Sequence, residues 1–229
     1  PIFVVKAKTG KTEKTQNIQT LKQKTKMKKV LLMLALLPAT LMATMPGQPS
    51  KHAVTYKVDA AKSKVEWYAE KVTGKHNGIV TIKSGEVNND HGKLSGTFAI
   101  DMTSITVTDL EGGMKGKLEG HLKSDDFFSV EKNPTATFIM TSVAPLADVK
   151  AGAPNFNVTG KLTIKGITND VTFPAMIRFE GNTMTAKGDV KIDRTKYDIR
   201  YGSKTFFSDI GDKAIYDEFT IKLDIVAGM

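Results

Sequence analysis

Three consecutive runs of alternating apolar and polar residues constrain the fold of this chain most strongly. They cover residues 155–165, 170–180 and 183–193, and only short spacers separate them. Successive side chains of a β-strand point to opposite faces, so each run has one apolar and one polar face. Both spacers begin with a glycine, which suits a tight turn. The pattern therefore predicts an antiparallel meander.

The same alternation predicts strands on both sides of this meander. We expect them over residues 54–59, 64–71, 76–88, 94–101 and 135–144, with a last strand over residues 217–226. A sheet of eight or nine strands with one continuous apolar face must close on itself or pack against a second sheet. Because most connections are short and sequential, we predict an all-β fold in which an up-and-down antiparallel barrel is favoured over a sandwich.

The strand pattern is interrupted between residues 109 and 123. Here Leu110, Met114, Leu118 and Leu122 recur every four residues, which is a helical spacing. Glycines in this segment each weaken a helix by up to about 1 kcal/mol relative to alanine. We therefore predict a short helix that is held mainly by packing.

Residues 27–43 have the pattern of a secretory signal peptide. A basic start at Met27 is followed by an apolar run and by small residues that end at Ala43. The apolar run is well short of the roughly 20 residues that cross a bilayer, so no stable membrane span is expected after cleavage. We expect residues 1–26 to be a non-native or disordered upstream extension, residues 44–53 a linker, and residues 54–229 the barrel domain. The location expected for the domain is periplasmic or secreted, in a bacterium.

The basic character of the chain belongs to this leader and not to the domain. The formal net charge is +9, of which residues 1–26 supply +6 and two further lysines, Lys28 and Lys29, supply +2. Only +1 remains, since 9 − 6 − 2 = 1, so charge gives no argument for a nucleic-acid partner and none is expected. The chain has no cysteine, so an exported domain would depend on its core and not on disulfides.

No motif in the sequence indicates a catalytic chemistry. The Gly-x-Ser-x-Gly motif, which forms the nucleophile elbow of many hydrolases, is absent. The glycines at 112–116 do not form a phosphate-binding loop, because the upstream glycine and the serine or threonine of that motif are missing. The four histidines, His52, His76, His91 and His121, are widely separated and show no helical ligand spacing. We therefore predict no catalytic residue, no metal site and no cofactor, and a protein that is not an enzyme.

The apolar face of the predicted sheet combines large aromatic residues with small ones. The small residues are Gly96, Gly160, Ala175, Ala186 and Gly188. They either let strands bend at barrel corners or leave room for one slender ligand inside. For the second case, the predicted apolar lumen is lined by Val65, Trp67, Phe98, Phe138, Phe156, Leu162, Phe173 and Ile177.

A polar head group would need partners at the mouth of such a lumen. The candidates are His76, His121, Arg194 and Arg200. For the arginines, surface ion pairing is the alternative, such as Arg194 with Asp193 or Asp198.

Several stretches, in one order along the chain, carry a family resemblance. They are residues 56–59, 63–67, 121–128, 134–138 and 160–168, with 192–194 as a weaker last piece. On these pieces the chain resembles the YceI-like family of bacterial periplasmic, lipocalin-like proteins. The resemblance implies an extended eight-stranded antiparallel, lipocalin-like β-barrel with a short helical cover. It also implies export, a polyisoprenoid or other long-chain lipid in the interior, and no settled catalytic activity.

The chain departs from the family pattern after Arg194. In the family this arginine often begins the motif Arg-x-Asp/Glu-Phe-Gly. In this chain it is followed by Thr195, Lys196, Tyr197 and Asp198. We therefore expect residues 199–212 to shape a different rim of the barrel.

Three functions from different classes remain open at this point. The leading hypothesis is an exported barrel that sequesters or carries one long-chain amphiphile, such as a polyisoprenoid or a fatty-acid derivative, without altering it. The second is an enzyme that acts on a lipid head group, with His76 or His121 as a general base. The third is a solid-core surface interaction module, in which the inward glycines only bend strands. A homodimer is left open in each case.

Overall fold

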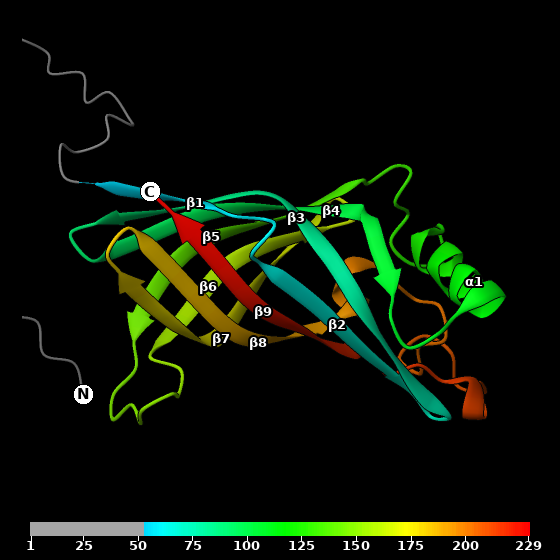
Figure 1. The fold of residues 1–229 in the computed structure, drawn as a ribbon. Helices are drawn as coiled ribbons and strands as arrows, with labels where there is room; N and C mark the ends of the chain where they lie inside the picture. The colour runs from blue at the N-terminus through cyan, green and yellow to red at the C-terminus, as the bar shows by residue number, and fades with distance from the viewer. Residues whose placement is uncertain (1–52) are drawn as a thin grey trace, which may run out of the picture. The chain divides into compact units, whose positions relative to one another are not determined.

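The computed structural model describes residues 53–229. The predicted upstream extension, the signal peptide and nearly all of the linker lie outside the described residues. The described part carries nine strands and one α-helix, in the order shown in Figure 1. The strands are β1 (Val54–Val58), β2 (Lys64–Lys71), β3 (Gly74–Asp90), β4 (Lys93–Val107), β5 (Thr135–Pro145), β6 (Phe156–Ile164), β7 (Ile167–Glu180), β8 (Thr183–Asp193) and β9 (Glu218–Gly228). The helix is α1 (Gly112–Lys123), and two short 3₁₀ turns are η1 (Arg194–Tyr197) and η2 (Gly211–Lys213).

The strands form one closed antiparallel barrel. Its hydrogen-bonded order is β3-β2-β9-β8-β7-β6-β5-β4, and a further pairing of β3 with β4 closes the ring. β1 lies in the same gap as β2, because it too pairs with β3 and β9. β1 and β2 thus fill a single position of the ring in succession, and the predicted eight-stranded antiparallel barrel is confirmed.

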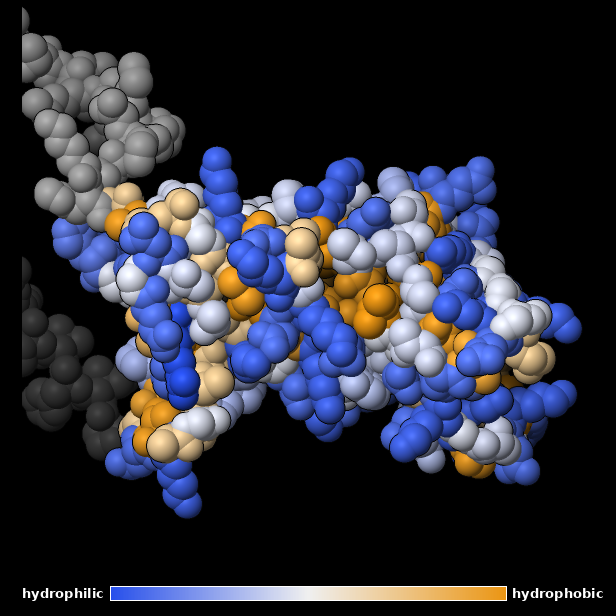
Figure 2. Space-filling view, viewed as in Figure 1, coloured by the Kyte–Doolittle hydropathy of each residue, from blue (hydrophilic) through white to orange (hydrophobic). Residues whose placement is uncertain are grey.

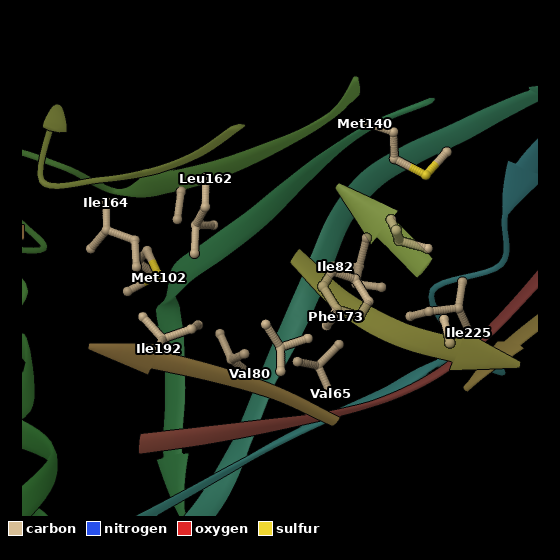
Figure 3. Close-up of a cluster of buried hydrophobic side chains, with 14 of the residues drawn as sticks. Val65, Val80, Ile82, Met102, Met140, Leu162, Ile164, Phe173, Ile192 and Ile225 are labelled. Carbon is tan, nitrogen blue, oxygen red and sulfur yellow. The ribbon is translucent and has the colours of Figure 1, made fainter. Parts of the chain in front are cut away.

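The predicted alternation decides which side chains face inward. In β6, Val158, Gly160, Leu162 and Ile164 are buried, and the residues between them are less so. Apolar side chains from strands on opposite sides of the ring converge in the interior, as Figure 3 shows for Val65, Phe173 and Ile192. Burial of this apolar surface stabilises the fold, at roughly 25 cal/mol per Å².

One register shift in the barrel lies next to an inward glycine. The pairing of β5 with β6 shifts after Met140, whose partner is Gly160. A side chain at Gly160 would overlap both the ring of Phe138 and the carbonyl oxygen of Ile139. Gly160 therefore allows the Phe138 ring to pack close to its backbone, and the space that it leaves is filled. At this position the glycine does not leave room for a ligand.

The helical cover lies at one end of the barrel, together with the β8–β9 connection (Figure 1). The predicted helix over 109–123 begins at Gly112 in the structure, so Leu110 lies outside it. No residue of α1 is buried, and Met114 is exposed. Leu122 packs against the core, and Glu119 accepts a hydrogen bond from the backbone N–H of Val107 at 2.9 Å. Packing holds this helix through its last turns only.

Candidate ligand-binding cavity

The interior of the barrel contains a cavity of about 240 Å³. Every strand from β2 to β9 contributes to its wall, and the wall is almost entirely apolar. At the helical end it is covered by Leu122, Phe127 and Phe128 from the β4–β5 connection and by Ile199 and Ile215 from the β8–β9 connection. The interior of this barrel is therefore not filled by its own side chains.

The cavity is long and narrow. Along β8 its wall runs from Met184 to Ile192, about 27 Å along the strand, which corresponds to roughly 20 Å along the barrel axis because barrel strands are tilted. Its volume exceeds the roughly 150 Å³ that holds a benzene molecule in an engineered protein cavity. It lies below the roughly 300 Å³ at which ordinary ligand pockets begin. A space of this length and volume suits one slender hydrocarbon chain better than a bulky ring system.

The outer surface of the barrel contrasts with this interior. Figure 2 shows a face covered mainly by polar side chains, with a strip of apolar surface between them near its centre. Lysine–carboxylate pairs join neighbouring strands on the outside, for example Lys187 with Asp224 at 2.7 Å and Lys161 with Asp170 at 3.1 Å. The alternation in the sequence thus gives the barrel a polar exterior and an apolar interior.

Seven of the eight residues predicted for the lumen line the cavity. They are Val65, Trp67, Phe98, Phe138, Leu162, Phe173 and Ile177. Phe156 does not: at the start of β6 it packs against the apolar core, and Val158 is the first residue of that strand in the wall. Among the small inward residues, Ala175, Ala186 and Gly188 border the cavity. Whether any of these residues contacts a ligand stays a prediction.

Sequence reasoning left some wall residues unnamed. Met184, Val190 and Ile192 share the inward face of β8, and the alternation of that strand could have identified them. Phe127 and Ile199 come from irregular segments, where no period tells which side chain points inward.

Arg194 is a buried cation beside the helical end of the cavity, with 4 % of its surface exposed. Its Nη1 donates to the carbonyl oxygens of Ile199 and Tyr201 at 3.0 and 2.8 Å. Its Nε donates to the carbonyl of Tyr216 at 3.1 Å, and Nη2 donates to that of Ile215 at 3.0 Å. Four of the five N–H groups of the guanidinium are thus used by backbone carbonyls.

The ion-pair partner of Arg194 is Asp217. Nη2 lies 3.2 Å from Oδ1 of this carboxylate, an ion-pair distance without hydrogen-bond geometry. Burial lowers the pKa of Arg194, although Asp217 and Asp193 act in the opposite direction. The suggested surface pairs with Asp193 or Asp198 are not the ones formed, because Asp193 caps η1 and Asp198 pairs with Arg200. In this conformation backbone carbonyls take four of the five donors of Arg194 and Asp217 balances its charge, and its predicted ligand role stays untested.

The two candidate histidines lie outside the cavity wall. His76 Nδ1 lies 2.9 Å from Asp109 Oδ2. Burial alone would raise the pKa of Asp109, but hydrogen bonds from the Asn77 N–H and from His76 hold it below its ordinary value. His121 packs edge-on against Tyr201, with ring centres 4.5 Å apart. The structure therefore does not bring these imidazoles together at the cavity.

Two observations concern residues 53–229 alone. No helix there is both long and apolar enough to span a bilayer. Among the same residues, no three histidine or acidic side chains are grouped closely enough to hold a metal ion.

Comparisons with known proteins agree with this geometry. The model of the YceI-like domain family matches residues 56–227. A UPF0312 protein of Pseudomonas paraeruginosa is 45% identical over 62 residues, which is 27% of this chain and 29% of that protein. The match thus spans about three-tenths of the length of such curated relatives.

Two solved structures have the same fold. Burkholderia cenocepacia BcnA is 32% identical, with a TM-score of 0.57 over 74% of this chain and 99% of that one. A polyisoprenoid binding domain from Saccharophagus degradans, implicated in plant cell wall breakdown, is 15% identical. Its TM-score is 0.52 over 76% of this chain and 97% of that domain. At that identity the second likeness is one of fold alone.

Proposed function

This chain belongs to the YceI-like family, and from that premise we propose that its barrel binds one long-chain, lipid-like amphiphile. The protein sequesters or carries this molecule and does not alter it chemically. A polyisoprenoid or a fatty-acid derivative is the proposed class of ligand, in keeping with the description of the Saccharophagus degradans domain.

The observation that carries the proposal is the long apolar cavity inside the closed barrel. Each methylene group that moves from water into such a space gains about 0.8 kcal/mol. Ten methylenes would therefore supply about 8 kcal/mol before the costs of association are subtracted. A tail of this kind needs few polar contacts, which agrees with a wall that offers almost none.

The competing hypotheses receive less support. An enzyme that uses His76 or His121 on a head group would need these side chains at the cavity, and neither lies in its wall. A solid-core interaction module would need a filled barrel, whereas the interior here has a connected void. We therefore favour ligand binding over catalysis, and a lipid carrier over a solid-core interaction module.

We also propose that the domain acts after export from the cytoplasm. The support is the basic and apolar pattern of residues 27–43. Fractionation of bacterial cells that express the full chain tests this part. A periplasmic or secreted product that begins near residue 44 is expected, and a cytoplasmic product of full length would contradict it.

Solvent extraction of the purified protein, followed by mass spectrometry, tests the binding function. One amphiphile at about one molecule per barrel is expected. The delipidated protein should then take up a long-chain fluorescent probe. Clean protein without lipid and without probe uptake would overturn the proposal.

A matched pair of variants links uptake to the cavity. Ala186 lies in the cavity wall and Ala144 is exposed on β5. Ala186→Phe places a ring in the void and is expected to abolish probe uptake, whereas Ala144→Phe leaves uptake unchanged. Equal uptake by both variants would show that the probe binds elsewhere.

A further inference from the structure

The pairing of β2 with β9 is interrupted near the helical end of the barrel (Figure 1). The regular ladder between the two strands ends at the pair Tyr68–Thr220, and the next pair is Lys71–Ile215. Two residues of β2 lie between these pairs, against four on the other side, residues 216–219. Extra residues on one side of a ladder leave it locally unpaired. Residues 216–219 therefore form a bulge in the barrel wall.

A polar recess on the outer surface of the barrel lies beside this bulge. Two of its lining residues, Tyr216 and Phe219, also line the apolar cavity inside. The other lining residues are all polar: Tyr68, Glu70, Lys191, Asp217, Glu218 and Thr220. The recess and the cavity thus lie on the two sides of the bulge, with two aromatic residues as their common wall.

These two aromatic residues are held differently. Phe219 is partly buried in the core and packs against Phe128 of the β4–β5 connection, with ring centres 6.3 Å apart. Tyr216 is 52% exposed. An exposed side chain changes its rotamer rapidly, whereas a packed ring cannot move without disturbing its neighbours. Tyr216 is therefore the residue of the common wall that can move aside and connect the recess with the cavity.

The recess carries a net negative charge. Its lining has three carboxylates and one lysine. Lys191 pairs with Glu218 at 2.8 Å, and Arg194 lies 3.2 Å from Asp217, so these two carboxylates are balanced. Within residues 53–229, the Glu70 carboxylate has no ion-pair partner. An anionic group in the recess would meet this charge at close range, and a group that donates hydrogen bonds would find acceptors.

We propose that the recess receives the polar head of the bound amphiphile and that Tyr216 is the lid between the recess and the cavity. The inference rests on the proposed function and names the chemistry of its ligand. The head donates hydrogen bonds and carries no negative charge, as in a long-chain alcohol or amine. The tail passes Phe219 and runs along the cavity toward Met184 at the far end.

A matched ligand series tests the chemistry of the head on the delipidated full-length protein. The series is a long-chain alcohol, the amine and the carboxylate of the same chain length, each displacing a bound fluorescent probe at pH 7. The wild type is expected to bind the carboxylate most weakly. Glu70→Gln removes the charge and keeps the size, so it should bring the carboxylate about two- to fivefold closer to the alcohol. Glu180→Gln, an exposed change at the end of β7, should keep the wild-type ratio. A carboxylate that binds as tightly as the alcohol, or equal ratios in both variants, would overturn the head-group assignment.

The position of the entrance is tested by labelling, since the chain has no cysteine of its own. Glu70→Cys that carries a bulky maleimide should lose probe uptake, whereas Glu180→Cys with the same label should keep it. Tyr216→Ala removes the lid and should speed both uptake and release of the probe. Phe207→Ala, a change of an exposed aromatic residue in the same connection but outside the recess, should leave both rates unchanged.

The outcomes separate the inference from the proposed function. Uptake that survives the label at residue 70, or equal rates in Tyr216→Ala and Phe207→Ala, would overturn the inference and leave the binding function standing. Failure of every long-chain ligand to bind the unlabelled wild type would overturn the proposed function, and the inference with it.

Discussion

Nη2 of Arg194 lies 3.2 Å from Oδ1 of Asp217, so a buried cation ties the two ends of the β8–β9 connection together. Arg194 directly follows β8, and Asp217 directly precedes β9. The same guanidinium holds four carbonyls of residues 199–216, which form part of the cover over the cavity. One side chain thus organises a long irregular segment that has little regular structure of its own.

Removal of Arg194 should destabilise the barrel strongly. Arg194→Ala leaves Asp217 without its cation and four carbonyls without their donor, and we expect a loss of about 3–5 kcal/mol in the free energy of unfolding. Urea denaturation measures it. Arg178→Ala, which removes an exposed arginine on β7, should change stability by less than about 0.5 kcal/mol. Similar small losses for both variants would contradict the structural role of Arg194.

The contact between Gly160 and Phe138 should appear as a coupling energy. Gly160→Ala forces a methyl group against the Phe138 ring, and we expect a loss of about 1–3 kcal/mol. In a Phe138→Leu background the same change should cost less, because the smaller side chain leaves room. A double-mutant cycle from urea denaturation measures the difference. Strict additivity of the two changes would show that the ring does not occupy the space above Gly160.

Tyr197 should make the protein sensitive to alkaline pH. Burial raises the pKa of its phenol to about 12, above the ordinary 10.0, and its hydroxyl has no hydrogen-bond partner. The raised pKa contributes stability that is complete below pH 10 and is lost as pH rises through the folded pKa. Between pH 10 and 12 the free energy of unfolding should therefore fall by about 1.4 kcal/mol per pH unit from this group.

Tyr197→Phe provides the control for this pH dependence. The substitution removes the phenol, so the alkaline slope should become shallower, and stability near pH 7 should stay equal or rise because no hydrogen bond is lost. Denaturation midpoints at pH 7, 10 and 11 compare the two proteins. A large loss at pH 7 in the variant would mean that the hydroxyl has a partner in solution.

Ligand binding should raise thermal stability by mass action. At a free ligand concentration 100 times the Kd, binding contributes about 2.7 kcal/mol, which corresponds to a rise in Tm of roughly 5–10 °C for a domain of this size. Differential scanning calorimetry of delipidated protein with and without a long-chain ligand measures it. Ala186→Phe should show no such rise in Tm. A rise of equal size in that variant would show that the ligand binds outside the cavity.

Much of the barrel could be predicted from the strand period. The alternation in 155–193 placed Leu162 and Phe173 on the inner face, and both line the cavity. Phe156 has the same alternation, yet the void ends before it is reached, because a period tells which face a residue occupies and not how far an empty space extends. His76 and His121 were chosen for their chemistry, and the structure places them on β3 and on α1, outside the cavity wall.

The order of apolar and polar residues by itself determined most of the strands and their inward faces, and a separate set of short sequence stretches carried the family resemblance. The period could do so because side-chain orientation in a strand is a local property that repeats every two residues. Only the tertiary structure decided that the barrel closes through β3 and β4, that Arg194 donates its hydrogen bonds to backbone carbonyls, and that the Trp67 N–H has no hydrogen-bond partner. These outcomes depend on contacts between segments far apart in the chain, and no local pattern encodes which donor meets which acceptor.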